Sequence, residues 1–320
     1  IRAQGHNALK IPLYLPLFSH EQNEFEAPVF YGAVNLYLKQ QFSLFRRMPS
    51  WVDAWLNSPA VLRFAAKKAH STRASGLEDM TISMLMGEHG QQKEELEKLV
   101  HWMETHFKAD VIHISNALLL GLAHKLRERL KVPVVCSLQD EDVWVEPMHP
   151  EFGQKVWDLM AEKAADVDMF IPVSHYFSAY MQEKLSLSED RMRPLYLGID
   201  PANYTYIPAL EKPRTIGYLS RMCYSNGLDI LVDAFILLKK DTRNHDVRLA
   251  LTGGYTSDDV SFLKKQKRKL ADAGLIGDVD FIEDFDGEHR QGFLNRISLL
   301  SVPVRRGEAF GIYLTEAMAS

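Results

Sequence analysis

Two carboxylates stand eight residues apart near the end of the chain, Glu308 and Glu316 in the stretch RRGEAFGIYLTEAMAS. Between them, Gly311 precedes an apolar run that predicts the start of a helix. The first amides of a helix are unpaired donors with partial positive charge, and they bind phosphate. Carboxylates suit vicinal hydroxyls because they accept two hydrogen bonds at once. The rise of about 7.5 Å from Gly311 to Glu316 therefore fits a diphosphate at the helix start, with one carboxylate on its sugar side and the other near a ribose.

Other chemical interpretations of this chain are less specific. Taken singly, Glu308 could be a loop charge and Glu316 an exposed helix residue. The stretch QDEDVW, residues 139–144, holds three acids that suit a divalent metal, but we expect an ordinary loop there. The histidines are scattered without the H-x-x-x-H spacing of a zinc helix. We therefore predict no metal site.

The elements that must position these carboxylates form a repeating pattern. Short apolar strands alternate with longer helices, which predicts parallel sheets covered on both faces. Strands are expected at 11–18, 110–114, 132–138, 168–174, 192–198, 215–220, 247–254, 278–283 and 299–304, and helices at 93–107, 118–130, 154–165, 175–185, 228–240, 258–274, 288–298 and 312–319.

The pattern breaks at residues 201–213, PANYTYIPALEKP, whose three prolines predict a linker. We therefore predict two Rossmann-like α/β domains, residues 1–205 with an aromatic insertion at about 19–95, and residues 206–320. Ligands of such sheets bind beyond the carboxyl ends of the strands, so we expect the site in a cleft between the domains. We also expect both domains to be truncated at their outer ends.

Composition excludes several classes of protein. The 320 residues carry a net charge of −5, which argues against a protein that coats nucleic acid. Two distant cysteines, Cys136 and Cys223, favour a reducing, cytoplasmic setting. No apolar run reaches the length of a transmembrane helix. Neither the dinucleotide fingerprint G-x-G-x-x-G after a strand nor the P-loop occurs.

The stretch GEAFGIYLTEAMAS resembles the E-x7-E signature of the family 4 retaining glycosyltransferases, which have the two-domain GT-B fold. GYLSRMCYSNGLDILVDAF is similar to the first strand, loop and helix of that family's donor domain. LALTGG, which ends at Gly254, is similar to its next strand and glycine turn. DVIHIS resembles an acceptor-domain strand with an active-site histidine, and VFYGAVNLYLKQQF resembles the insertion of glycogen and starch synthases. The likeness is strong over 215–320, moderate over 110–200 and weak before 95.

The resemblance implies specific roles for residues of the second domain. Glu308 would contact the donor sugar near its anomeric centre, and Glu316 would bind the nucleotide ribose. Phe310 and Gly311 would offer backbone amides to the sugar and phosphate. Arg221 would hold the diphosphate with its planar guanidinium.

In the first domain, the resemblance places His113 near the reacting sugar. The family often carries its histidine two residues later, where this chain has Ser115, and Asn116 is a further polar candidate. The alternative for His113 is a core histidine at a strand end.

Asn226 is the largest departure from the family pattern, which usually has a lysine before this glycine. An uncharged side chain loses roughly 2 kcal/mol of charged hydrogen bonding, about thirtyfold in binding or rate. Arg305 and Arg306 are candidate substitutes for the missing charge, although a solvated loop is the favoured interpretation of both.

The resemblance implies a metal-independent retaining glycosyltransferase without further cofactor. It would move a sugar from a nucleotide diphosphate donor to a hydroxyl of a glycan, polysaccharide or lipid-linked sugar. A non-catalytic nucleotide-sugar or glycan-binding homologue is the alternative that Asn226 motivates. A nicotinamide-dependent oxidoreductase is a weaker one, since its fingerprint is missing.

The run KKQKRK, residues 264–269, places five positive charges in six residues. With apolar Phe262, Leu263 and Leu270 on the same helix, it suggests peripheral contact with an anionic membrane surface. A solvated helix face is the alternative that we favour. We expect a cytoplasmic protein, with peripheral contact to the inner face of the membrane as the alternative.

Overall fold

The computed structural model describes residues 4–11, 13, 78–283, 285 and 287–320. The chain divides into two compact units, Ile1–Leu195 and Tyr196–Ser320. Most of the strand predicted at 11–18 and most of the aromatic insertion predicted at 19–95 lie outside the described residues. Within the described residues, no helix is both long and apolar enough to cross a lipid bilayer.

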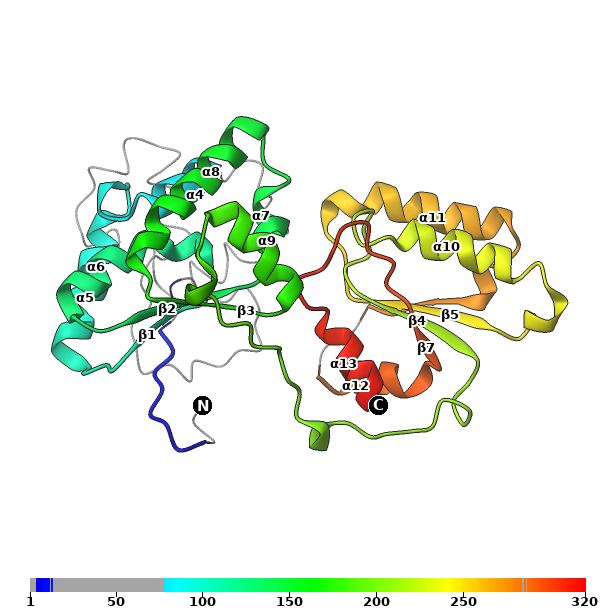
Figure 1. The fold of residues 1–320 in the computed structure, drawn as a ribbon. Helices are drawn as coiled ribbons and strands as arrows, with labels where there is room; N and C mark the ends of the chain where they lie inside the picture. The colour runs from blue at the N-terminus through cyan, green and yellow to red at the C-terminus, as the bar shows by residue number, and fades with distance from the viewer. Residues whose placement is uncertain (1–3, 12, 14–77, 284, 286) are drawn as a thin grey trace, which may run out of the picture. The chain divides into compact units, whose positions relative to one another are not determined.

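The first unit is built on a parallel sheet with strand order β1-β2-β3 (Figure 1). Its strands are β1 (Ile112–Ile114), β2 (Val134–Leu138) and β3 (Met169–Pro172). Along β2, fully buried residues alternate with partly buried ones, as expected for a central strand with both faces covered. All three strands coincide with predicted ones.

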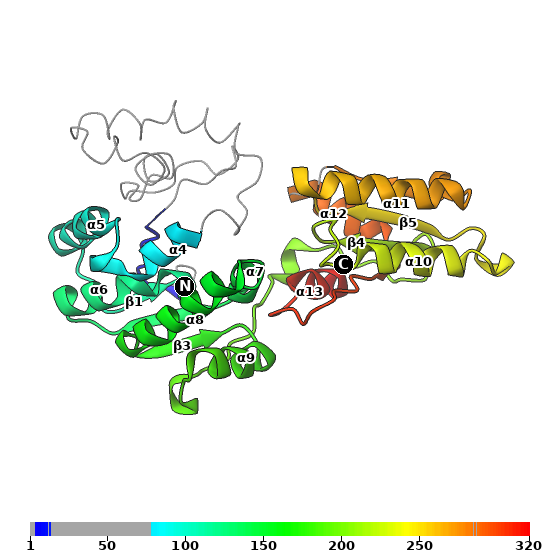
Figure 2. The ribbon, with the colours of Figure 1, turned by 90° about the horizontal axis from the view of Figure 1, so that it is seen from above.

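Helices surround this sheet, and α8 and α9 begin at start signals that the sequence provides. α9 begins after Ser174, whose hydroxyl accepts a hydrogen bond from the Phe177 amide at 3.0 Å. α8 begins with Pro150 at its first position. α5 lies beside α6, and α8 lies beside α9 (Figure 2). The helices are α4 (Glu78–Leu85), α5 (Lys93–His106), α6 (Ala123–Leu130), α7 (Glu141–Val145), α8 (Pro150–Lys163) and α9 (His175–Leu185), with a 3-10 segment at Ala117–Leu122.

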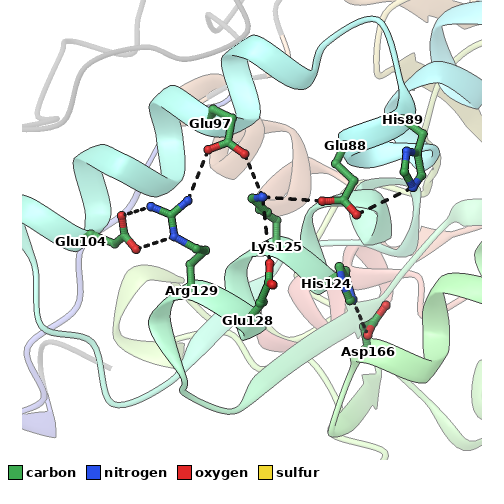
Figure 3. A network of polar contacts seen from close by, with 9 residues as sticks. All are labelled: Glu88, His89, Glu97, Glu104, His124, Lys125, Glu128, Arg129 and Asp166. Carbon is green, nitrogen blue, oxygen red and sulfur yellow. Dashed lines mark hydrogen bonds and ion pairs between the residues drawn. The ribbon is translucent and has the colours of Figure 1, made fainter.

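A network of charged side chains joins α5 to α6 (Figure 3). Lys125 on α6 lies 2.9 Å from Glu97 on α5, and Arg129 donates to Glu104 at 2.8 Å through its Nε atom. The hydrogen bond from Lys125 lowers the pKa of Glu97. Single exposed pairs stabilise a fold only slightly, so the value of this network lies in fixing how α6 packs on α5.

Two predictions for the first unit were wrong. Residues 141–145 form the short helix α7 rather than a loop, because acidic side chains in a first turn interact favourably with the helix dipole. Residues 192–198 form no regular strand but only a bridge between Met192 and Phe170. Arg193 and Leu195 donate to the Phe170 and Pro172 carbonyls of β3 at 2.9 Å, but Pro172 has no amide with which to donate back and extend the ladder.

The second unit holds a parallel sheet with strand order β6-β5-β4-β7. Helices α10 and α11 cover one face of this sheet, and α12 and α13 cover the other (Figure 1). The strands are β4 (Thr215–Leu219), β5 (Arg248–Thr252), β6 (Val279–Phe281) and β7 (Leu299–Leu300), and the helices are α10 (Leu228–Leu238), α11 (Val260–Asp272), α12 (Gly287–Arg296) and α13 (Ile312–Ala319).

The connector between the predicted domains packs on the second unit. The Tyr204 hydroxyl donates to Glu316 on α13 at 3.0 Å. The Lys212 ammonium donates to the carbonyls of Leu294 and Ser320 at 3.2 and 3.0 Å. These contacts explain why the compact units divide after Leu195, earlier than the boundary predicted at 205.

Candidate functional site

Three loops meet at the carboxyl edge of the second sheet, after β4, β5 and β7. Gly253 approaches the β4 loop so closely that a Cβ atom would lie 2.2 Å from the Ser220 carbonyl oxygen. Gly227 has φ +72°, and a Cβ atom there would lie 1.8 Å from the Pro303 carbonyl oxygen. Only glycine fits such positions. The Met222 amide also donates to the Gly254 carbonyl at 2.8 Å, so the predicted glycine turn adjoins the β4 loop.

Arg221 in the β4 loop is held by the β5 loop. Its Nε atom donates to Asp259 Oδ2 at 2.9 Å, and one terminal nitrogen donates to Asp259 Oδ1 at 3.2 Å. The same nitrogen donates to the Thr256 hydroxyl at 3.0 Å. The hydrogen bonds that Arg221 donates to Asp259 raise the pKa of Arg221 further above neutrality. The guanidinium is therefore a fixed, permanently charged donor at this edge.

Asn226 faces the same loop without contributing charge. Its Nδ2 atom donates to the Ser220 hydroxyl at 2.8 Å, and its backbone carbonyl accepts from the Tyr218 hydroxyl at 3.3 Å. Asn226 thus stabilises the loop that carries Arg221. Its contacts do not replace the positive charge of a lysine.

Arg305, a candidate substitute for that lysine, is engaged elsewhere. Its guanidinium pairs with Asp229 on α10 at 2.6 Å and lies 3.9 Å from the centre of the Tyr224 ring. Its Nε atom donates to the Tyr224 carbonyl at 3.1 Å. Arg305 therefore anchors the β7 loop to the β4 loop.

The helix start predicted at Gly311 is present. Gly311 caps α13 in the left-handed conformation with φ +77°, and its carbonyl accepts from the Leu314 amide at 2.9 Å. The ring of Phe310 lies against that of Tyr196, with centroids 6.1 Å apart. Because β7 runs parallel to β4, the loop that follows β7 brings the first amides of α13 to the same end of the sheet as the β4 loop.

Glu308 is exposed in the loop before α13, and Tyr313 on α13 donates a hydrogen bond to its carboxylate. The Tyr313 ring is buried in a core cluster with Leu219 and Phe293. Burial, reinforced by the bond to Glu308, raises the pKa of Tyr313. The phenol therefore keeps its proton and holds the carboxylate in one orientation.

Glu316 is buried, and Arg290 from α12 grips its carboxylate with two nitrogens, the Nε atom at 2.9 Å. Tyr204 adds a third donor at 3.0 Å. The Glu316 carboxylate, which we expect to bind the ribose, thus already accepts hydrogen bonds from three donors of its own unit. A ribose hydroxyl would have to share or displace one of them.

In the first unit, His113 lies within β1 rather than at its end. Its Nε2 atom is 2.8 Å from the Ser137 hydroxyl on β2, and desolvation lowers its pKa. The lowered pKa favours the neutral imidazole near pH 7, in which one ring nitrogen donates and the other accepts a hydrogen bond. Ser115 lies beyond the strand, where its carbonyl accepts from Gln139 at 3.2 Å. The Asn116 side chain accepts from the Leu118 amide at 3.1 Å and caps the 3-10 segment.

Glu141 is a buried carboxyl at the carboxyl edge of the first sheet. Oε1 accepts from the Ala117 amide at 2.8 Å, whereas Oε2 is buried without a hydrogen-bond partner. Burial raises the pKa of Glu141 to about 7. The preceding residue, Asp140, has φ +60°, an uncommon conformation for a residue other than glycine.

Within the described residues, no group of three or more His, Cys, Asp and Glu side chains is arranged to hold a metal ion. The acids of 139–144 are divided between the buried Glu141 and the more exposed Asp140 and Asp142.

Several partners at the second unit's edge were missed from the sequence. They are Thr256, Asp259, Tyr313, Arg290 and Tyr204. Thr256 and Asp259 carry a signal that could have been recognised, the capping-box spacing before a helix. The other three are recognisable only in three dimensions.

Solved structures with this fold include several glycosyltransferases. HepE from Anabaena, in complex with UDP, is 18% identical with a TM-score of 0.59 over 71% of this chain and 61% of that one. Sucrose-phosphate synthase from Thermosynechococcus elongatus is 19% identical with a TM-score of 0.55, over 70% and 58%. S. aureus TarM, bound to UDP, is 14% identical with a TM-score of 0.53, over 71% and 43%. The chain therefore spans about three fifths of the length of HepE.

These likenesses show the fold, two α/β domains with parallel sheets of the GT-B type. No curated protein sequence matches the chain. Residues 85–203 match the family model Glycosyltransferase Family 4, and residues 206–320 match the model Glycosyl transferases group 1. With both models matched in succession, the chain belongs to the family 4 glycosyltransferases.

Proposed function

We propose that this protein is a retaining, metal-independent glycosyltransferase that moves a sugar from a nucleotide diphosphate donor to a hydroxyl acceptor. The observation that carries the proposal is the shared edge of the second sheet. There, Arg221, the amide donors of α13 and the carboxylate of Glu308 are joined through three interlocked loops. A nucleotide diphosphate-sugar needs this combination, namely cationic and amide donors for its diphosphate and a carboxylate for the hydroxyls of its sugar.

The donor is a uridine diphosphate sugar in this proposal. HepE has been solved with UDP and with UDP-glucose, and TarM with UDP. Arg221 and the first amides of α13 would bind the diphosphate, while Phe310 and Gly311 would offer amides to sugar and phosphate. Glu308 would face the sugar and Glu316 the ribose, with Gly254 allowing close approach of the backbone. His113 would act from the acceptor domain.

Stabilisation of the leaving diphosphate would supply much of the rate enhancement. Negative charge develops on the diphosphate as the glycosidic bond breaks, and donors fixed in advance stabilise it without reorganisation. Arg221 meets this requirement, since the hydrogen bonds from Nε and a terminal nitrogen to the β5 loop are already formed.

Glu308→Gln tests the role of the sugar-side carboxylate. Transfer and slow hydrolysis of UDP-glucose and related donors would be measured for the wild type, for Glu308→Gln and for Glu211→Gln. Glu211 is exposed in the connector and serves as a matched control. We expect lower turnover only in Glu308→Gln, and unchanged turnover in that variant would refute the assigned role.

A second candidate is a non-catalytic nucleotide-sugar or glycan-binding protein. Asn226 favours this candidate, because its side-chain amide donates to Ser220 and the usual lysine charge is missing. Calorimetry with a panel of nucleotide sugars, run beside the transfer assay, separates the two. Binding without transfer by the wild type would support this candidate.

Peripheral membrane contact through residues 264–269 is a further part of the proposal. Lys264, Lys265, Lys267 and Arg268 are exposed, whereas Gln266 is buried and Lys269 pairs with Asp233 at 2.6 Å. We expect cosedimentation with anionic vesicles that weakens in Lys264→Glu/Lys265→Glu. Equal cosedimentation of both proteins would show that this helix face is only solvated.

A further inference from the structure

We propose that Asp259, together with Thr256, is a positioning residue that orients Arg221 toward the diphosphate of the donor. The proposal rests on the proposed function, because it concerns how the donor is held. It adds to the donor site two residues that lie outside the E-x7-E helix.

Asp259 accepts hydrogen bonds within its own helical segment, in addition to those from Arg221. Its Oδ2 atom accepts from the Thr256 amide at 2.9 Å and from the Thr256 hydroxyl at 2.8 Å. Together with Thr256 it forms a capping box at the start of the segment that leads into α11. The carboxylate is therefore fixed by local contacts.

The fixed carboxylate then receives two nitrogens of Arg221 from the neighbouring loop, at 2.9 and 3.2 Å. The Thr256 hydroxyl accepts from the same guanidinium at 3.0 Å. Two donors in parallel define the plane of a guanidinium as well as its position. Arg221, Asp259 and Thr256 therefore form a closed triangle that ties the β4 loop to the β5 loop.

The exposure of the two partners differs in the direction that a ligand site requires. The Arg221 side chain is 50% exposed, whereas the Asp259 side chain is 10% exposed. The cation is thus presented at the surface while its counter-ion is hidden behind it. This pair would hold the cation for an anionic ligand more firmly than a flexible arginine could.

A positioning role and a purely electrostatic role of Asp259 predict opposite effects of Asp259→Asn on UDP binding. If Asp259 acts only through its negative charge, removing that charge should strengthen the binding of an anion. If it positions Arg221, the loss of a charged hydrogen-bond acceptor should weaken UDP binding about tenfold to hundredfold. Uridine has no phosphate, so its binding should not change.

The experiment is calorimetry of UDP and uridine with the wild type, Asp259→Asn and Asp280→Asn. Asp280 is a matched control because it pairs with Arg248 at 3.0 Å on β6 and β5, within the sheet rather than in the loops. We expect weaker UDP binding and unchanged uridine binding only in Asp259→Asn, with partial recovery in Asp259→Glu.

Equal or tighter UDP binding by Asp259→Asn would overturn the positioning role and leave the proposed function intact. Equal losses for UDP and uridine would also overturn it, since they would indicate a general loss of structure. If the wild type bound no nucleotide sugar and transferred no sugar, the proposed function itself would fail, and the positioning role with it.

Discussion

The hydroxyl of Tyr313 donates a hydrogen bond to the carboxylate of Glu308, five residues earlier in the chain. Tyr313 lies in the core and Glu308 at the surface, so a rigid ring helps to orient a surface carboxylate. We predict that Tyr313→Phe lowers kcat for sugar transfer about tenfold to hundredfold, since the lost bond involves a charged group. KM for the donor should change little.

Tyr180→Phe is the matched control for this prediction. Tyr180 also donates to a carboxylate, that of Glu146 at 3.2 Å, but it lies on α9 of the first unit. Its kcat should equal that of the wild type. A loss in Tyr313→Phe that appeared only in KM would contradict an orienting role for Tyr313.

Glu141 should make stability depend on pH near neutrality. Its pKa is raised from 4.5 to about 7 in the folded protein. Between these values the folded state keeps a proton that the unfolded state has lost, so stability falls as pH rises. Integrated over this window, the loss is on the order of 3 kcal/mol.

Urea unfolding of the wild type and Glu141→Gln at several pH values between 4.5 and 8 measures this effect. The difference in the free energy of unfolding, variant minus wild type, should grow with pH up to about 7 and then level off. The exposed Glu151 on α8 offers the control Glu151→Gln. A difference that stayed constant with pH would mean that Glu141 titrates normally.

The pair of Arg290 and Glu316 should be important for stability. Removing one partner of a fully buried ion pair costs about 3 kcal/mol or more. Because Arg290 is 29% exposed and Tyr204 still donates to Glu316, we expect a loss of about 2 kcal/mol here. We therefore predict such a loss for Arg290→Met, in which the Glu316 carboxylate stays buried. The double variant Arg290→Met/Glu316→Leu should recover part of it, and a double variant no more stable than the single one would argue against this account.

Gly253→Ala should destabilise the second unit. A Cβ atom at this position would lie 2.2 Å from the Ser220 carbonyl oxygen, and the backbone has φ +119°. Forcing an alanine into such a conformation costs about 2 kcal/mol. Gly277→Ala is the control, because a Cβ atom there meets nothing within 4 Å. Thermal unfolding should separate the two variants by several degrees.

The order of strands and helices could be predicted because each pattern is local. α10 and β5 follow from the periodicity of their own residues. The helix at 141–145 was missed because five residues are too few to show a helical period. The apolar residues of 192–198 predict a strand, whereas Pro172 on β3 has no amide to donate and the ladder ends after one bridge.

The site was predicted less completely than the fold. Glu308, Gly311 and Arg221 follow from short motifs, and the structure places them in loops and a helix start at one edge. Their partners cannot be found by spacing, since Arg221 and Asp259 are 38 residues apart and Arg290 and Glu316 are 26 apart. Such pairs depend on how the loops fold against one another.

Three arginines near this edge, Arg221, Arg290 and Arg305, are each paired with a carboxylate of the same unit. Their charges are therefore balanced before any ligand arrives. A nucleotide diphosphate would meet oriented donors rather than a strongly positive surface. Salt screens net charge far more than it weakens short hydrogen bonds, so donor affinity should change little as ionic strength rises.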